Sequence, residues 1–559
     1  MSGKSSLLGT LTTSTLDNGR GKSRLSMLKH RHEITSGITS SVTQELLGYQ
    51  VIENGNVEVV NYARANVASW IDVHVAASGS RLVFTSDSAG HPRYRRTTVR
   101  GLVGWAPHWT LLCVPADDTD DMADKSRSMN ASQQYLGSAV SDIDLSGAQL
   151  DLCLRLKLPL VIVITKLDLA SRTGLRKTLT KILDALKSAD RKPAILANSP
   201  GAVSERDLHG VEASQIEAAY SLSLPLLNDL TGIVPIVLTS VVQGTGIQEL
   251  HALLHELPIP DLTESTTEGT NAIFHIEDVY GKPAAGLVVS GRLRSGRIAI
   301  GDTMVLGPSS GHDQLEDSED SDERPPRRSS SHLPTSRSFP GALRDSHLAI
   351  RYFQLPSQEW RRVKVTGIRN LRLPVHSLLP DQIGTIAVIP DEVDGKAPLS
   401  ATLARTRKGM VLATVQPLAT RTFVAEFKRE DLEALAVGNH VVAYIASVRA
   451  SARVVSARAP DSPGEGQHSE DESVGQNAFA FDELAEAVDG PCESVAGAVT
   501  APDLWVTFSF DAAKEFVMVG DQVLIMPGGG PGLYGGQERG EKGIAGLEGF
   551  VGIVREIHA

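Results

Sequence analysis

The chain has few cysteines and no long apolar run, and both features limit the classes of protein to which it can belong. Only three cysteines occur in 559 residues, at Cys113, Cys153 and Cys492. Their wide spacing forms neither a metal-ligand cluster nor a disulfide framework, so we expect a reducing compartment, the cytoplasm. No apolar run approaches the ~18–20 residues that span a bilayer, and no signal peptide is visible. We therefore expect no membrane partner.

Positively charged residues are also fewer than negatively charged ones. Lys and Arg number 54 against 66 Asp and Glu, which leaves a formal net charge of −12. Proteins that coat nucleic acid neutralise phosphates with many cations. The balance argues against such coating, and we expect no DNA partner. A local basic surface is still compatible with this net charge, because the acidic residues are concentrated in candidate insertions.

The first residues, MSGKSS, carry the end of a phosphate-binding loop. The full pattern is G-x-x-x-x-G-K-[ST] after a buried strand. Gly3, Lys4 and Ser5 match its end, whereas the first glycine and the strand have no counterpart. We interpret this start as a truncated gene model or an internal Met, and expect an unpaired slot in the sheet. Lys4 would reach the β- and γ-phosphates and Ser5 would ligate Mg²⁺, while backbone N–H groups from Gly3 to Ser6 would hold phosphate oxygens. An exposed N-terminus is the alternative.

A second motif, DSAG, spans Asp87 to Gly90. Residues 81–85 before it are apolar enough to predict a short buried strand with Asp87 just past its end. The Asp87 carboxylate could hold a Mg²⁺-bound water there. Gly90 has no Cβ, so its backbone N–H could approach a γ-phosphate. An ordinary Asp/Gly turn is the alternative.

A third motif, TKLD, follows a continuous apolar run at residues 160–164, which predicts a central parallel strand. The Asp168 carboxylate could accept from guanine N1–H and from its exocyclic amine, and adenine offers neither group in that arrangement. The Lys166 stem would cover the base. Thr165 occupies the first position of the motif, and a solvated turn is the alternative. A last run at residues 234–238 leads to Ser240 and Val241.

These motifs, in this order, resemble the translational, elongation factor Tu-like GTPases. Three segments place the closest resemblance in the eukaryotic branch of GTP-binding proteins one and two: residues 16–21 (LDNGRG), residues 32–42 (HEITSGITSSV), and DSAGH with TKLD. The resemblance implies a multidomain chain, an α/β P-loop GTPase domain followed by two β-barrel domains. It also implies hydrolysis of GTP to GDP with Mg²⁺, and partners among the ribosome, tRNA or the RNA-turnover machinery.

The resemblance also implies roles for individual residues. Thr39 would meet Mg²⁺ and the γ-phosphate, and His91 would position the attacking water, so that His91, Thr39 and Lys4 form the catalytic set. The loop at Ser240 and Val241 would give a backbone N–H to guanine O6. Thr165 stands where Asn is usual, and the residues after His91 depart from the family's acidic-basic pair.

Composition sets the expected domain boundaries. The GTP-binding domain would span residues 1–260, with two candidate insertions, an acidic and polar one at 117–144 and one of mixed composition at 199–229. A first barrel would span 270–412, with strands at 272–280, 286–293, 298–305, 360–369 and 383–388, closure at 405–410 and a disordered insertion at 309–346. A second barrel would span 418–559, with a low-complexity insertion at 461–490.

A binding scaffold with a defective nucleotide site is the rival function. The missing loop glycine and Thr165 favour it. The intact Lys4, Ser5 and Asp168 favour a working GTPase.

Overall fold

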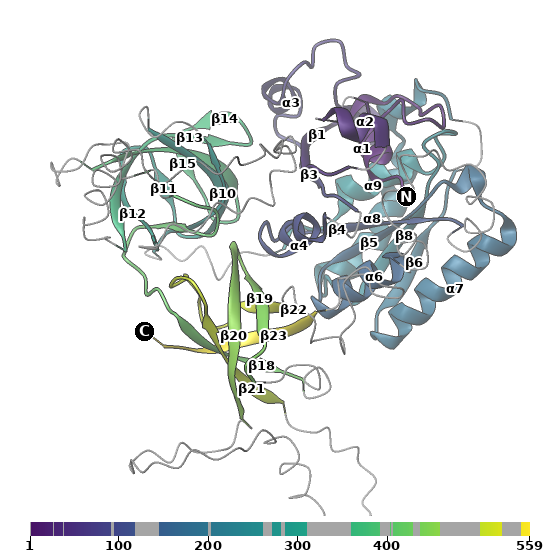
Figure 1. The fold of residues 1–559 in the computed structure, drawn as a ribbon. Coiled ribbons are helices and arrows are strands. Elements are labelled where there is room, and N and C mark those ends of the chain that lie inside the picture. The colour runs from purple at the N-terminus through teal and green to yellow at the C-terminus, as the bar shows by residue number, and fades with distance from the viewer. Residues whose placement is uncertain are drawn as a thin grey trace, which may run out of the picture.

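An α/β domain is followed by two β-barrels in the computed structural model (Figure 1), which confirms the expected fold class. The structure describes residues 2–25, 27–28, 30–36, 39–90, 94–117, 145–199, 203–260, 271–280, 286–309, 359–391, 403, 406–428, 437–458, 503–527 and 549–558. His91, nearly all of 309–346 and all of 461–490 lie outside these ranges. No helix within them is long and apolar enough to cross a bilayer.

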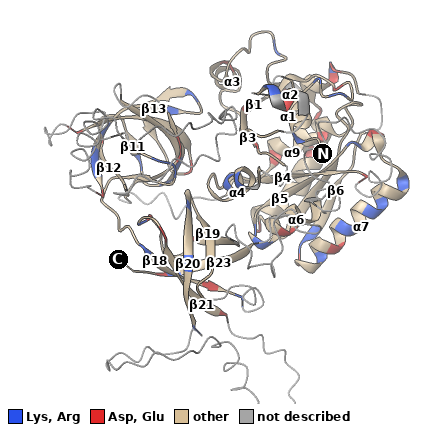
Figure 2. Cartoon of the chain, viewed as in Figure 1, with Lys and Arg blue, Asp and Glu red and all other residues tan. Residues whose placement is uncertain are grey.

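A four-stranded parallel sheet forms the centre of the α/β domain. Its order is β4 (Thr110–Pro115), β5 (Leu160–Thr165), β8 (Ile233–Leu238) and β6 (Lys192–Leu196). Every residue of β5 is buried, as the apolar run predicts. Val161 and Val163 face one side of the sheet, while Ile162 and Ile164 face the helices α6 (Leu145–Arg155) and α7 (Arg172–Ser188) on the other. Figure 2 shows basic residues spaced along α7.

A second sheet is antiparallel, in the order β3 (Leu82–Asp87), β1 (Thr43–Val51), β2 (Val57–Val60) and β7 (Gly210–Val211). Within the described residues β3 pairs only with β1 and β4 only with β5, so each strand is an edge. The prediction of a buried strand at 81–85 was wrong. The strand runs through Asp87 and its middle is only half-buried, because one side has no neighbouring strand.

Helices join the two sheets into one core. α1 (Lys4–Thr13) places Leu7 and Leu11 against β1 and β5, and α9 (Ile247–Glu256) covers the same face. The region 199–229 was predicted as an insertion, and this was wrong. It contains η7 (Asp207–His209), β7, α8 (Ala213–Ser223) and η8 (Leu224–Leu227), and its buried Leu208, Ala219 and Leu226 belong to this core.

Smaller elements surround the second sheet. They are α2 (Arg31–Ser36), η1 (Glu53–Gly55), α3 (Trp70–Ala76) and α4 (Arg95–Val103). Ser69 caps α3 and Asp72 completes the capping box, which fixes where this helix begins. A further turn, η6 (Leu167–Leu169), follows β5.

The first barrel closes through six strands. They are β9 (Ile273–Tyr280), β10 (Leu287–Ser295), β16 (Ile383–Pro390), β13 (Arg361–Asn370), β12 (Thr303–Gly307) and β17 (Val411–Ala413), with β14 (Leu373–Val375) beside β13 and a small β11–β15 pair (Ile298–Ala299, Ser377–Leu378). Two predictions were wrong. Residues 298–305 form two short strands, because the chain turns at Gly301 (φ +98°). Closure comes from β17 and follows the turn at Gly409 (φ +88°).

The second barrel is also closed. Its order is β18 (Thr422–Phe427), β21 (Leu504–Phe510), β20 (Val448–Arg458), β19 (His440–Ile445), β22 (Gln522–Pro527) and β23 (Phe550–His558). Phe423 packs between Phe508 and Phe510 in its interior, with ring centroids 5.2 and 5.1 Å away. Such aromatic pairs bury large area and give the small barrel a firm core.

Helix α4 contacts both barrels (Figure 1). Its Arg100 Nε lies 2.9 Å from Glu277 Oε2 on β9 of the first barrel. Its Val99 belongs to an apolar cluster with Leu152 and Leu156 of α6 and with Tyr444, Leu524 and Met526 of the second barrel. Helix α4, which follows the DSAG motif, therefore contacts both barrels and helix α6.

Candidate nucleotide and metal site

The start of α1 is shaped by Gly3, which has a left-handed backbone (φ +74°) where other residues are strained. The Gly3 carbonyl accepts the first hydrogen bond of the helix, from Leu7 N at 2.9 Å. The Lys4 ammonium lies directly over Gly90, and a Cβ on Gly90 would overlap it. Positive charge and the free N–H groups of a helix start converge there, which is the chemistry that binds phosphate.

Three oxygen-bearing side chains from separate segments meet beside this helix start. Ser5 Oγ donates to Asp87 Oδ2 at 2.5 Å and lies 2.9 Å from Thr39 Oγ1. Ser5 is the second residue of α1, Thr39 precedes β1, and Asp87 ends β3. The pairing of Thr43 with Asp87 fixes the last two segments side by side. Hydroxyl and carboxylate oxygens are the donors that Mg²⁺ binds, so this set fits the metal.

Asp87 is a buried carboxylate, with 7% of its surface exposed. Burial raises its pKa above the ordinary value, the Ser5 hydrogen bond and the Lys4 charge lower it, and the Glu33 charge raises it, and the net direction is upward. A carboxylate in that position gains free energy from any cation brought next to it. The electrostatics therefore agree with the oxygen donor set.

A second polar group lies at the ends of β5 and β8. Ser240 Oγ donates to Asp168 Oδ1 at 2.6 Å, and Gln243 N donates to Ser240 Oγ at 3.1 Å. Lys166 takes a left-handed backbone (φ +58°), which turns the chain between Thr165 and Asp168. These contacts orient the Asp168 carboxylate at the carboxyl edge of the parallel sheet, where α/β folds bind ligands.

Thr165 joins the two groups. Its Oγ1 donates to Ser2 O at 2.7 Å, so the residue before Gly3 is tied to the strand that carries Asp168. The carbonyl of Val241 accepts from Asp17 N at 2.9 Å, which brings the LDNGRG segment to the same edge. Of the predicted residues, the structure gathers Gly3, Lys4, Ser5, Thr39, Asp87 and Gly90 in one group and Thr165, Lys166, Asp168, Ser240 and Val241 in the other. Ser6 lies next to Ser5 on α1, and His91 lies outside the described residues.

Sequence reasoning missed Glu33 as a site residue. Its side chain is fully buried beside the segment that carries Thr39. Glu33 lies inside the HEITSGITSSV segment that carries the family resemblance, but that segment was used to assign a role to Thr39 only.

The chain is similar to curated proteins over part of its length. It is 32% identical to GTP-binding protein 2 of Homo sapiens over 315 residues, which are 55% of this chain and 44% of that protein. It is 32% identical to GTP-binding protein 1 of Xenopus laevis over 307 residues, 55% of this chain and 40% of that protein. The chain thus spans less than half the length of these relatives. The predicted resemblance to GTP-binding proteins one and two is confirmed over that stretch.

Solved structures of low identity were also found. The translation elongation factor SelB from Methanococcus maripaludis in complex with the GTP analogue GppNHp is 16% identical, with a TM-score of 0.47 over 85% of this chain and 71% of that one. A bacterial selenocysteine-specific elongation factor, EF-Sec, is 12% identical, with a TM-score of 0.47 over 95% of this chain and 55% of that one. No family model matches the chain.

Proposed function

We propose that this chain binds GTP and GDP with Mg²⁺ and hydrolyses GTP as a conformational switch in the cytoplasm. The observation that carries the proposal is the convergence of Ser5, Thr39 and Asp87 from three segments, at 2.5 and 2.9 Å, beside the Lys4 ammonium. A hydroxyl from α1, a hydroxyl from the segment before β1 and a strand-end carboxylate are the parts that a phosphoryl-transfer site needs.

Each residue then has one task. Lys4 would bind the β- and γ-phosphates as a point charge, and the N–H of Gly90 would meet the γ-phosphate. Ser5, Thr39 and Asp87 would hold Mg²⁺, directly or through water, and the metal would supply neutralising charge at the phosphates. Asp168, oriented by Ser240, would accept from the guanine edge, and Lys166 would cover the base. His91 would position the attacking water.

We also propose a biological setting for this activity. The relatives named above are GTP-binding proteins. The motif resemblance to elongation factors supports a role in translation or RNA turnover, with the ribosome, tRNA or RNA-processing proteins as partners. Two barrels that contact α4 would give such a switch a way to signal nucleotide state.

Base selectivity tests the proposal. In a competition titration, the chain should prefer GTP over ATP, because the Asp168 carboxylate accepts from two donors that only guanine presents. Asp168→Asn should weaken GTP binding and improve xanthine nucleotide binding, because the amide can donate to the xanthine C2 carbonyl. Asp184→Asn on the outer side of α7 is the matched control and should change neither. Equal affinity for ATP and GTP, or no nucleotide binding at all, would favour the scaffold function.

A further inference from the structure

One buried carboxylate outside the predicted site holds the Thr39 segment. Glu33 belongs to α2, and none of its side chain is exposed. Its Oε1 accepts from Ser40 N at 2.8 Å and from Ser40 Oγ at 2.9 Å. The same oxygen accepts from Ser41 N and Ser41 Oγ, both at 2.9 Å. Its other oxygen accepts from His30 N at 3.2 Å.

These bonds act on the chain directly after Thr39. Ser40 follows Thr39 without a gap, and Thr43 then begins β1 and pairs with Asp87. Thr43 Oγ1 also donates to Met27 O at 3.1 Å, which anchors the other end of the short stretch. Thr39 therefore stands at the edge of a segment whose next two residues are held by one carboxylate. Its Oγ1 is placed 2.9 Å from Ser5 Oγ as a result.

The charge of Glu33 is stabilised by this arrangement. Burial raises its pKa, but the hydrogen bonds from Ser41 and Ser40 outweigh burial and lower the pKa to about 2. The group is therefore ionised at neutral pH, and bonds to an ionised acceptor are about twice as strong as neutral ones. The negative charge of Glu33 also raises the pKa of Asp87, so ionising Asp87 costs free energy that a cation beside it would offset.

We propose that Glu33 is a positioning residue that presents Thr39 to the γ-phosphate and its metal. The proposal rests on the function proposed above and adds a specific consequence. Thr39 would touch the γ-phosphate as well as the metal, and the diphosphate has no γ-phosphate, so losing Glu33 should weaken the triphosphate state much more than the diphosphate state.

Nucleotide affinities of the full chain with Mg²⁺ test this consequence. Glu33→Ala should weaken a non-hydrolysable GTP analogue about 10-fold or more and leave GDP within about 2-fold, since small displacements of a positioned group have large effects. Glu33→Gln should fall between, because its Oε1 still accepts but carries no charge. Glu58→Ala, which removes a half-exposed carboxylate paired with Arg64, should change neither affinity. An equal loss for both nucleotides, or no loss in Glu33→Ala, would overturn the proposal.

Hydrogen exchange of the nucleotide-free chain tests directly whether Glu33 holds Ser40 and Ser41. The backbone amides of Ser40 and Ser41 should be protected in the wild type and exchange at least 10-fold faster in Glu33→Ala, while the β5 amides keep their rates as a check on folding. Unchanged rates at Ser40 and Ser41 would show that Glu33 does not hold this segment. A wild type that binds no guanine nucleotide would instead overturn the proposed function, and with it the Thr39 role, whatever the exchange result.

Discussion

At the scale of single residues, the absence of a side chain at Gly90 is as informative as any functional group. The Lys4 ammonium occupies the space that a Cβ at position 90 would need. A lysine that binds phosphates must be free to lie along the loop, and only glycine leaves that room. The steric relation between these two positions is therefore part of the proposed phosphate site.

Gly90→Ala tests this relation. The flexible end of Lys4 can move away from the added methyl group, but the methyl group should also crowd the approach of the position 90 N–H to the γ-phosphate, so GTP binding should weaken by about 10-fold. Gly101→Ala is the matched control, since its Cβ would meet Ser88 Cβ at 3.7 Å, an ordinary contact. Isothermal titration with GTP measures both. Full affinity in Gly90→Ala would remove Lys4 and Gly90 from the phosphate site.

The residue-level site was largely visible in the sequence, because its motifs are local. Lys4 and Ser5 belong to a short phosphate-loop pattern, and Asp168 follows the apolar run of β5 at the carboxyl edge of the parallel sheet. Asp87 ends β3 of the antiparallel sheet, so its position beside Ser5 does not follow from the parallel strands. The role of Glu33 was not visible, although the residue lies in the HEITSGITSSV segment. Its partners are set by the path of the chain between α2 and β1, and no period in the sequence shows that path.

At the scale of elements, the hairpin between β13 and β14 carries an unusual turn. Asn370 pairs with Leu373, so the two turn residues are Leu371 (φ +44°) and Arg372 (φ +70°). Positive φ costs roughly 1–2 kcal/mol for each such residue. The tip contacts the α/β domain: Arg372 lies 3.9 Å from the centre of the Trp70 ring, and the Leu371 carbonyl lies 3.1 Å from His74 Nε2. Contacts with α3 therefore offset the strain of the turn.

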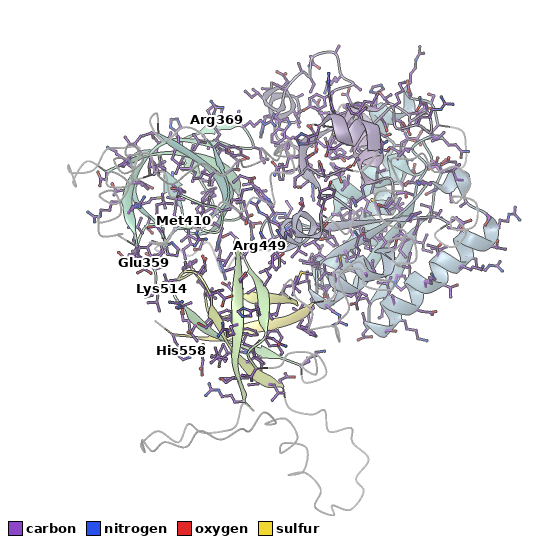
Figure 3. The ribbon with its side chains drawn as sticks, in the orientation of Figure 1. Glu359, Arg369, Met410, Arg449, Lys514 and His558 are labelled. Atoms are coloured by element: carbon purple, nitrogen blue, oxygen red, sulfur yellow. The ribbon has the colours of Figure 1, made fainter. Side chains whose placement is uncertain are left out.

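Arg372→Ala should weaken the contact between this hairpin and α3. The lost cation–π contact should lower the free energy of unfolding by about 1 kcal/mol. Arg369→Ala, on β13 just before the turn and on the outer surface of the barrel (Figure 3), is the control and should stay within ~0.5 kcal/mol of wild type. Urea denaturation followed by tryptophan fluorescence reports both. Equal stabilities would mean that Arg372 contributes nothing to the contact.

Helices and strands could be predicted where their apolar pattern was strong. The predictions failed where turns or tertiary contacts determined the structure. The strand β5, predicted from the apolar run at residues 160–164, ends one residue later, at Thr165. The region 199–229 was misjudged because its buried residues are scattered among polar ones, and only packing against α9 reveals their role. The Leu371–Arg372 turn has neither Asn nor Gly at its two turn positions, which are the usual signals of such a hairpin, so it could not be predicted from its residues.

At the scale of the whole molecule, α4 and its neighbours determine how the three domains contact one another. Glu277, fully buried on β9, faces Arg100 of α4, and Asp278 next to it lies 3.4 Å from the same guanidinium. Burial raises the pKa of Glu277 to about 7, although the Arg100 charge and hydrogen bond lower it. Contact between the first barrel and α4 therefore depends on a carboxyl group that titrates near neutral pH.

The sign of this dependence follows from proton binding. A carboxyl group whose pKa is raised from 4.5 to about 7 in the folded protein binds more protons there than in the unfolded chain, so the stability of the fold falls as pH rises through that range. Glu277→Gln cannot titrate and should flatten the change in melting temperature between pH 5 and pH 7.5. Asp151→Asn, an exposed group on α6, should leave the change as in wild type. A steeper or unchanged pH profile in Glu277→Gln would contradict the assignment.

The two sheets of the α/β domain have a consequence for energetics. Since β3 and β4 are both edges within the described residues, side-chain packing joins the sheets and the backbone ladder does not cross between them. Asp87 ends β3 and Thr39 precedes β1 of one sheet, while Asp168 and Ser240 follow β5 and β8 of the other. A guanine nucleotide held by both sets would add a direct link between the two sheets. Because the sheets already share one core, calorimetry should show a single transition for the α/β domain, and its temperature should rise when GTP is bound.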